Sequence, residues 1–196
     1  MSTARCRRSQ PVKITESPLP GVFVIEPRVH GDARGFFVET FRESLLAPAG
    51  LETHFVQDNQ SRSARGILRG LHYQLEQPQA KLVRVSSGRV FDVAVDIRRG
   101  SPHFGRWFGM ELDDVRQQMM YVPKGFAHGF LVMSAEADFI YKCSDYYHPA
   151  SERGLAWNDR DIGIAWPDLG HPPLLSSKDS DLPGLAQATD LPVFMR

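Results

Sequence analysis

The sequence RVFDVAVDIR, residues 89–98, is the most informative stretch for the fold of this chain. Phe91 and every second residue up to Ile97 are apolar, whereas Asp92 and Asp96 lie on the opposite face together with small apolar side chains. A period of two residues is typical of a β-strand. The face with the two acids predicts either a solvent-exposed surface or the polar interior of a small barrel, and such an interior usually holds a ligand.

Short runs of the same kind lie on both sides of this strand. They are rich in Val, Ile, Phe and Tyr, and many of the 16 Gly and 14 Pro residues separate them. The expected strands are residues 22–27, 35–41, 54–60, 81–88, 89–98, 106–112, 119–123, 128–133 and 138–147. Only residues 42–49 and 178–190 have a helical pattern. Many short strands separated by turns indicate a mainly β fold, an antiparallel sandwich or barrel with a few short helices.

The length and composition of the chain predict one domain. The chain has 196 residues, of which 42% are hydrophobic, so it can bury a substantial core. We expect a polar N-terminal tail at residues 1–11 and a single domain at residues 12–196. From about residue 157 the sequence becomes irregular and rich in proline, and we expect this segment to wrap back over the barrel.

Charge and cysteine content argue against several classes of protein. Lys plus Arg and Asp plus Glu both number 23, so the basic excess typical of a nucleic-acid-binding protein is absent. No apolar run approaches the roughly 18 residues of a membrane-spanning helix. The N-terminal residues lack the apolar region of a secretory signal, and a transit peptide is the weaker alternative. Cys6 and Cys143 lie far apart, so we expect no disulfide framework and a cytoplasmic location.

The stretch GILRGLHYQ, residues 66–74, combines a cation and an imidazole in an apolar frame. Strict alternation would place Arg69 and His72 on opposite faces of a strand. Gly70 between them allows a bulge or a kink in the backbone. We therefore predict an irregularity at Gly70 that brings Arg69 and His72 to the same side.

His128 follows a turn in VPKGFAHGF, residues 122–130, and this stretch resembles the second sequence box of cupin barrels. A metal-binding cupin usually pairs such a histidine with a His-x-His motif and a Glu. The partner stretch here is His72-Tyr73-Gln74, and the remaining histidines are scattered. Because zinc or iron requires three or four ligands, we predict no metal site and no cofactor.

Several charged residues each allow two interpretations. Lys81 begins a strand and is either an edge residue or a cation near a developing oxyanion. Arg34 and Glu39 flank the sequence GFF and, on local grounds, form a surface ion pair. Lys178 and Asp179 follow two serines, one of which would cap a short helix.

Taken together, these stretches resemble the dTDP-4-dehydrorhamnose 3,5-epimerase family. The motifs are RGFFVE (34–39), QDN (57–59), GILRGLHYQ (66–74), KLVR (81–84), VFDVAVDIR (90–98), GFAHGF (125–130), YKCSDYY (141–147) and WND (157–159). They occur in the order of that family and extend from about residue 20 to about residue 180. The resemblance implies a cupin-type jelly-roll barrel that works as a homodimer without metal or cofactor.

The resemblance also implies a reaction on a dTDP-4-keto-6-deoxyhexose. The substrate would be dTDP-4-dehydro-6-deoxy-D-glucose and the product dTDP-4-dehydro-L-rhamnose, a step in dTDP-L-rhamnose biosynthesis. The protons on C3 and C5 are both next to the C4 ketone, so one base and one oxyanion site serve both carbons through an enolate. By resemblance, His72 is the base and Asp179 orients it. Tyr141 is the acid on the opposite face, and Lys81 stabilises the enolate while Asp92 holds Lys81.

The other residues carried over from the family bind the nucleotide and the sugar. Arg34 and Lys178 would bind the diphosphate, and Arg69 would hold a phosphate or support the enolate. Tyr147 would stack on thymine, on the same strand face as Tyr141. Further contacts would come from Glu39, Gln57, Asn59, His128 and Glu152. The partner subunit would supply some contacts of the segment around Arg34.

Three other functions stay open at this point. A relative of the family that inverts only C3 or only C5 of a related dTDP-4-keto-6-deoxy sugar would share these motifs. A non-catalytic sugar-binding cupin would lose the base or the acid, whereas His72 and Tyr141 are both present. A metal-dependent cupin would need a set of metal ligands that we do not find in the sequence.

Overall fold

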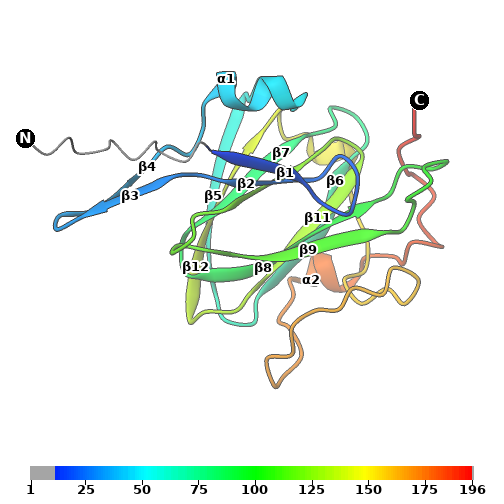
Figure 1. The fold of residues 1–196 in the computed structure, drawn as a ribbon. Helices are drawn as coiled ribbons and strands as arrows, with labels where there is room; N and C mark the ends of the chain where they lie inside the picture. The colour runs from blue at the N-terminus through cyan, green and yellow to red at the C-terminus, as the bar shows by residue number, and fades with distance from the viewer. Residues whose placement is uncertain (1–11, 196) are drawn as a thin grey trace, which may run out of the picture.

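The structure is a computed structural model and describes residues 12–195. The expected tail at residues 1–11, with Cys6 in it, lies outside the described residues. Two antiparallel sheets face each other (Figure 1). The larger sheet has the spatial order β1 (Lys13–Glu16), β2 (Phe23–Glu26), β10 (Met119–Val122), β7 (Lys81–Ser87), β12 (Glu136–Cys143) and β5 (Gln57–Ala64). The smaller sheet has the order β13 (Glu152–Gly154), β6 (Leu68–Gln74), β11 (Phe126–Val132), β8 (Arg89–Asp96) and β9 (Trp107–Asp113).

The predicted mainly β, antiparallel fold with a few short helices is confirmed. The main hydrophobic core lies between the two sheets, where Val83 and Phe139 of the larger sheet belong to one cluster with Val90 and Phe130 of the smaller. The ring centroids of Phe130 and Phe139 are 4.0 Å apart. Because stacked aromatic rings bury a large apolar area, this pair joins the two sheets.

Strand β8 is buried on both faces. Val90 and Ala94 belong to the core between the sheets, whereas Val93 and Val95 pack in a second cluster with residues of the C-terminal segment. Asp92 is fully buried. The acidic face of this strand was expected either to face solvent or to line the interior of the barrel. The second interpretation is confirmed and the first is wrong.

Few residues are helical. Helix α1 (Glu43–Leu46) continues into the 3-10 helix η1 (Ala47–Ala49), as expected for residues 42–49. The expectation of a helix over residues 178–190 is wrong in length, because α2 covers only Ser177–Ser180 and Pro183 follows shortly after it. A second 3-10 turn, η2, spans Pro149–Ser151. Within residues 12–195, no helix is long and apolar enough to cross a membrane.

Some strand boundaries differ from the expected ones. The strand expected at residues 138–147 ends at Cys143, so Tyr147 lies beyond β12 rather than on it. The strand expected at residues 54–60 begins at Gln57 and continues to Ala64. Strands β1, β3 and β13 were not expected, because each has only three or four residues, which is too short to show a clear alternating pattern.

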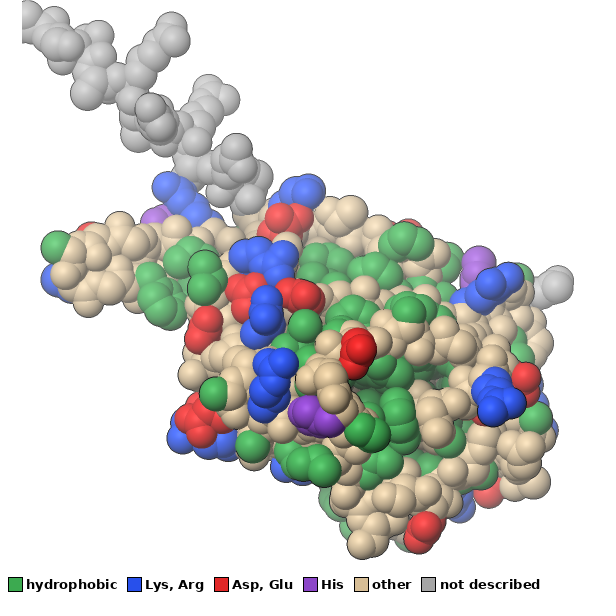
Figure 2. Space-filling view, turned by 90° about the horizontal axis from the view of Figure 1, so that it is seen from below, with side chains coloured by type: hydrophobic (Ala, Val, Ile, Leu, Met, Phe, Trp, Pro, Cys, Tyr) green, Lys and Arg blue, Asp and Glu red, His purple; other side chains and the backbone are tan. Residues whose placement is uncertain are grey.

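Strands β3 (Val29–Asp32) and β4 (Gly35–Val38) form a hairpin that projects from the two sheets (Figure 1). We call this hairpin, residues 29–38, the arm. Phe36 and Phe37 on the arm are 60% and 70% exposed. The space-filling view shows hydrophobic side chains along the projecting arm (Figure 2). The two phenylalanines therefore leave apolar surface exposed on the arm.

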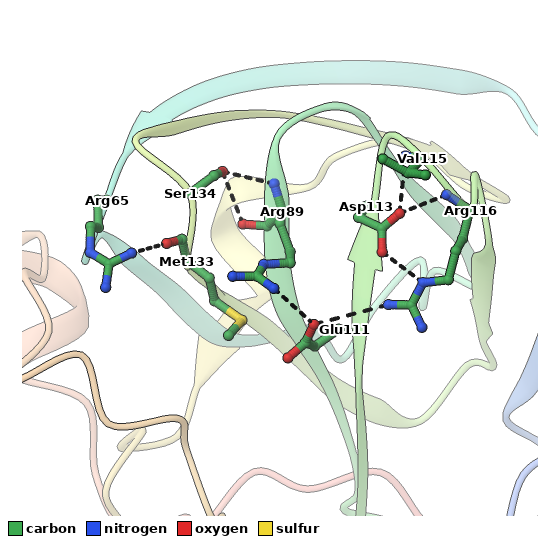
Figure 3. Close-up of polar contacts among 8 residues, drawn as sticks. All are labelled: Arg65, Arg89, Glu111, Asp113, Val115, Arg116, Met133 and Ser134. Carbon is green, nitrogen blue, oxygen red and sulfur yellow. Dashed lines mark hydrogen bonds and ion pairs between the residues drawn. The ribbon is translucent and has the colours of Figure 1, made fainter. Parts of the chain in front are cut away.

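A charged cluster lies at one end of the β8–β9 pair (Figure 3). Glu111 accepts ion pairs from Arg89 at 3.5 Å and from Arg116 at 4.0 Å, and Asp113 pairs with Arg116 at 2.7 Å. Ser134 Oγ accepts a hydrogen bond from the backbone N–H of Arg89 at 2.8 Å. Because most of these side chains are exposed, each ion pair contributes little free energy to the stability of the fold.

Candidate active site

Two adjoining cavities lie inside the barrel, with volumes of about 310 and 450 Å³. His72, Lys81 and Tyr141 line both cavities and therefore mark the place where they meet. The first cavity extends towards Gln57, Asn59, Tyr147 and Glu152. The second extends towards Arg69, His128, Lys178 and Asp179. These are eleven of the fourteen predicted site residues, and the structure brings them to one connected space.

Strand β6 contains the predicted irregularity. Across β6 and β11, His72 pairs with His128 but Arg69 pairs with Phe130, so β6 has one extra residue between these two pairs. The register shift includes Gly70. The prediction of a bulge is confirmed, and both Arg69 and His72 line the second cavity.

Close packing explains why this position is a glycine. Gly70 has a φ angle of +122°, which L-amino acids with a side chain rarely adopt. A Cβ atom at Gly70 would lie 2.6 Å from the Cα atom of Gly129 on β11. Both the backbone conformation and the approach of the neighbouring strand therefore require a residue without a side chain.

His72 is hydrogen-bonded to a carboxylate from the C-terminal segment. Its Nε2 atom lies 2.6 Å from Oδ1 of Asp179, which is 5% exposed. Burial lowers the pKa of His72 below its ordinary value, although the hydrogen bond and the charge of Asp179 act in the opposite direction. The imidazole is thus suited to be neutral, and able to accept a proton, at neutral pH.

The helix cap explains the position of Asp179. The side chain of Ser176 accepts a hydrogen bond from the backbone N–H of Asp179 at 3.1 Å, so Ser176 is the cap of α2. The turn is therefore a helix N-terminus, as the local pattern predicts, and its Asp179 also makes the hydrogen bond to His72. The same turn places Lys178 at the cavity.

Lys81 and Tyr141 reach the cavity from the sheet that faces His72. Lys81 begins β7 and Tyr141 is in β12, whereas His72 is in β6 of the other sheet. The Nζ atom of Lys81 lies 6.0 Å from the centroid of the Tyr141 ring. Burial lowers the pKa of Lys81 and raises the pKa of Tyr141. A substrate in the cavity would therefore lie between an imidazole on one wall and a phenol with a cation on the other.

Asp92 does not have the predicted partner. We expected it to hold Lys81, but its Oδ1 atom lies 2.8 Å from Nε2 of His128. Strands β8 and β11 are direct neighbours, with Asp92 paired to Phe130 and His128 to Ala94, so the two side chains meet diagonally. His128 lines the second cavity, and Asp92 lies behind it.

Hydrogen bonds order the mouth of the first cavity. Gln57 Nε2 donates to Asn59 Oδ1 at 3.0 Å, and Gln57 Oε1 accepts from the backbone N–H of Tyr147 at 2.8 Å. The hydroxyl of Tyr147 donates to Glu152 at 2.6 Å, and Lys178 also pairs with Glu152. Burial tends to raise the pKa of Glu152, but the bonds from Lys178 and Tyr147 lower it overall.

Arg34 and Glu39 lie away from this cavity. Arg34 is in the exposed turn of the arm and pairs with Asp32 at 2.5 Å. Glu39 pairs with Arg42 at 2.6 Å. The expectation of an ion pair between Arg34 and Glu39 is wrong, because each pairs with a residue that is nearer to it in the sequence. Neither residue contributes to the cavity of its own chain.

Some cavity residues were not identified from the sequence. Ser61 lines the second cavity, and Ser63 accepts a hydrogen bond from Arg69 at 3.0 Å. Both continue the alternation that begins at Gln57 and Asn59, so extending that strand by four residues would have identified them. Leu174 also lines the second cavity but lies in the irregular proline-rich segment, where no periodicity indicates its direction.

Metal-binding side chains do not cluster in the part of the chain that the structure describes. There, no group of three or more His, Cys, Asp and Glu residues is arranged to hold a metal ion. Cys143 is a buried free thiol beside Asn59, whose side-chain nitrogen lies 3.6 Å from its sulfur.

Known proteins share both the sequence and the fold. The family model described as dTDP-4-dehydrorhamnose 3,5-epimerase matches residues 16–187. A dTDP-4-dehydrorhamnose 3,5-epimerase of Pseudomonas aeruginosa is 51% identical over 182 residues, which cover 92% of this chain and 100% of that protein. A dTDP-6-deoxy-D-glucose-3,5-epimerase of Legionella pneumophila, solved in complex with dTDP-4-keto-L-rhamnose, has a TM-score of 0.91 and 48% identity, covering 94% of this chain and 100% of that one.

A solved enzyme with a narrower activity is also similar. A 3'-monoepimerase of Streptomyces bikiniensis, solved in complex with dTDP-quinovose, has a TM-score of 0.84 and 40% identity. The match covers 91% of this chain and 92% of that one. The two sheets, the cavity and these matches together identify the fold as the cupin type of such epimerases.

Proposed function

The chain belongs to the dTDP-4-dehydrorhamnose 3,5-epimerase family and is an epimerase of a dTDP sugar, and we propose that His72 is the base of its reaction. The protons on C3 and C5 of a 4-keto-6-deoxyhexose are acidified by the C4 ketone. A partly buried, neutral imidazole can remove them, and Asp179 at 2.6 Å stabilises the imidazolium that forms. The observation that supports this proposal best is the position of His72 and Tyr141 on facing sheets.

Inversion requires a proton from the face opposite the base. Tyr141 is the acid in this proposal, because burial raises the pKa of its phenol and keeps it protonated. Lys81 stabilises the negative charge on O4 of the enolate. Burial lowers the pKa of Lys81, while the nearby Asp92 and Glu152 carboxylates act in the opposite direction and favour its charged form.

The nucleotide occupies the first cavity and its mouth. Tyr147 is half exposed beside this cavity, so its ring is available to stack on thymine. Gln57 and Asn59 offer amide groups to the edge of the base or the deoxyribose. Arg69 and Lys178 supply positive charge for the diphosphate from the second cavity.

The arm belongs to a second copy of the site in this proposal. Arg34 and Glu39 are two of the predicted nucleotide contacts, and both lie outside the cavity of their own chain. The exposed Phe36 and Phe37 give the arm an apolar surface suited to a partner. We therefore propose a homodimer in which the arm of one subunit reaches the site of the other.

Proton NMR of dTDP-4-dehydro-6-deoxy-D-glucose incubated with the protein in D₂O tests the activity directly. We expect deuterium at both C3 and C5, together with formation of dTDP-4-dehydro-L-rhamnose. Exchange at one carbon only would instead support a mono-epimerase, the activity of the similar Streptomyces enzyme. If folded protein exchanges neither C3 nor C5, the result would contradict catalysis on this substrate.

A further inference from the structure

The second cavity contains a histidine–carboxylate pair besides His72–Asp179. His128 Nε2 lies 2.8 Å from Oδ1 of Asp92, and His128 is directly opposite His72 across β6 and β11. Side chains that are directly opposite in an antiparallel pair lie on the same face, with Cβ atoms about 5 Å apart. The two imidazoles are therefore neighbours on one wall of the cavity, each held by its own carboxylate.

The second ring nitrogen of His128 is accessible from the cavity. Among the described residues, Nδ1 makes no hydrogen bond. In that part of the chain, only Asp92 Oδ2 and Gln118 Oε1 are fully buried side-chain atoms without a partner. Nδ1 of His128 has no partner either but is not among them, so it is not fully buried. The ring of Phe139 stacks on the imidazole with a centroid distance of 6.0 Å and an angle of 26°, which fixes the plane of the ring.

The burial of Asp92 determines which ring nitrogen of His128 carries the proton. Asp92 is fully buried, and an ionised carboxylate can only accept hydrogen bonds. The Nε2 atom of His128 must then be the donor. A buried charge also needs a compensating one, and the attraction of Asp92 raises the pKa of Lys81 against the larger effect of burial. The attraction between Asp92 and Lys81 offers that compensation, and an imidazole that carries its single proton on Nε2 has Nδ1 as a hydrogen-bond acceptor.

We propose that Asp92 is a positioning residue that fixes His128 in the tautomer whose Nδ1 atom accepts a hydrogen bond from the C3 hydroxyl of the sugar. The other charged groups at this cavity are Lys81, Arg69 and Lys178, which donate, and Asp179, which is bonded to His72. The Nδ1 atom of His128 is thus an uncharged acceptor on this wall, beside the base His72, for a hydroxyl donor of the sugar. This inference rests on the proposed function, in which His72 removes the protons of C3 and C5. Of these two carbons, C3 carries a hydroxyl group that His128 can bind, whereas C5 carries a methyl group.

The tautomer can be measured without substrate. In protein labelled with ¹⁵N-histidine, long-range ¹H–¹⁵N correlations should show His128 protonated at Nε2 and unprotonated at Nδ1. In Asp92→Asn, the signals should shift towards a mixture of both tautomers. Protonation of Nδ1 alone in the wild-type protein would overturn the inference, and this result does not depend on the folding of any variant.

The effect on the reaction should differ between the two carbons. In Asp92→Asn we expect deuterium exchange at C3 to fall about 10- to 100-fold, as when the carboxylate behind a ligating imidazole is removed, and exchange at C5 to fall less. The dissociation constant of dTDP, which lacks the sugar, should stay within about twofold because Asp92 acts behind the sugar subsite. An equal loss at both carbons, or no loss, would overturn the assignment.

Two controls separate this role from a structural one. Asp138→Asn removes another mostly buried carboxylate, bonded to Arg62 at 2.6 Å, that does not line the cavity, so the ratio of C3 to C5 exchange should not change. His128→Gln keeps an acceptor oxygen and should exchange C3 about tenfold faster than His128→Phe, which has none. Equal rates in these two variants would contradict the acceptor role. If the wild-type protein exchanges neither carbon, the proposed activity fails, and the tautomer measurement still tests the Asp92–His128 pair.

Discussion

Tyr141 and His72 lie on opposite walls of the cavity and have separable tasks in the proposed reaction. In Tyr141→Phe, His72 can still remove a proton and return deuterium to the same face. We expect exchange at C3 or C5 to persist while the inverted product forms about 10²- to 10⁴-fold more slowly. NMR in D₂O measures both quantities in one sample. Loss of exchange and inversion to the same extent would show that Tyr141 is not the separate acid.

The pH dependence of kcat/KM should have two limbs, set by groups that burial shifts in a known direction. His72 must be neutral, and burial lowers its pKa below the ordinary 6.5, so the rate should fall only at a pH below that value. Lys81 must be charged, and burial lowers its pKa below the ordinary 10.5, so the alkaline limb should appear before that value. The raised pKa of Tyr141 places its own loss of a proton later.

A conservative variant checks the assignment of the alkaline limb. Lys81→Arg replaces the ammonium with a guanidinium that stays charged throughout this range. The remaining activity of this variant should therefore persist to a higher pH than in the wild-type protein. An unchanged alkaline limb in Lys81→Arg would assign it to another group.

At the scale of secondary-structure elements, the bulge in β6 is what brings Arg69 and His72 to one cavity. In Gly70→Ala, the methyl group would lie 2.6 Å from Gly129 Cα and the residue would keep a φ angle of +122°. We expect the free energy of unfolding to fall by about 2–5 kcal/mol from strain and overpacking. Exchange should fall about 100-fold, because a displacement of about 1 Å suffices for such a loss.

Gly100→Ala is the matched control for this variant. Gly100 also has a positive φ angle, +83°, but a Cβ atom there would have no neighbour within 4 Å. Its cost should be the backbone strain alone, about 1–2 kcal/mol, without an effect on exchange. Urea unfolding gives the stabilities. Equal effects of the two substitutions would show that the contact of β6 with β11 does not matter.

At the scale of the whole molecule, the proposed dimer makes each site depend on two chains. Replacing the exposed Phe36 and Phe37 with Ser should remove the apolar surface of the arm and shift the protein towards monomer. Sedimentation velocity measures this shift. A variant that stays dimeric would show that the arm is not the main contact.

Complementation between two inactive variants tests whether the arm acts in the partner. Arg34→Ala and His72→Ala should each have low activity alone. After mixing and subunit exchange, half of the dimers would be mixed, and one site in each would be intact, which restores about a quarter of the sites. Absence of any recovery in mixed dimers would place Arg34 and His72 in the same chain's site.

Local sequence patterns predicted the mainly β fold, most of the longer strands and the irregularity in β6. Alternation in residues 89–98 predicted β8 with two different faces, and both faces are observed. Gly70 between Arg69 and His72 predicted the bulge. These successes share a cause, because strand alternation and the conformational freedom of glycine act over a few residues and are therefore visible in any short stretch.

Only the tertiary structure decided which of these residues meet. Asp179 bonds to His72 across 107 residues of sequence, and Asp92 bonds to His128 rather than to Lys81. These contacts depend on which strands are neighbours and on how the irregular C-terminal segment packs, and no local pattern encodes either. For the same reason Arg34 on the arm and Glu39 just after it, both identified by their motif, lie outside the cavity of their own chain. Residue types and strand periodicity are local properties of this chain, whereas the partner of each buried charge depends on the packing of the whole molecule.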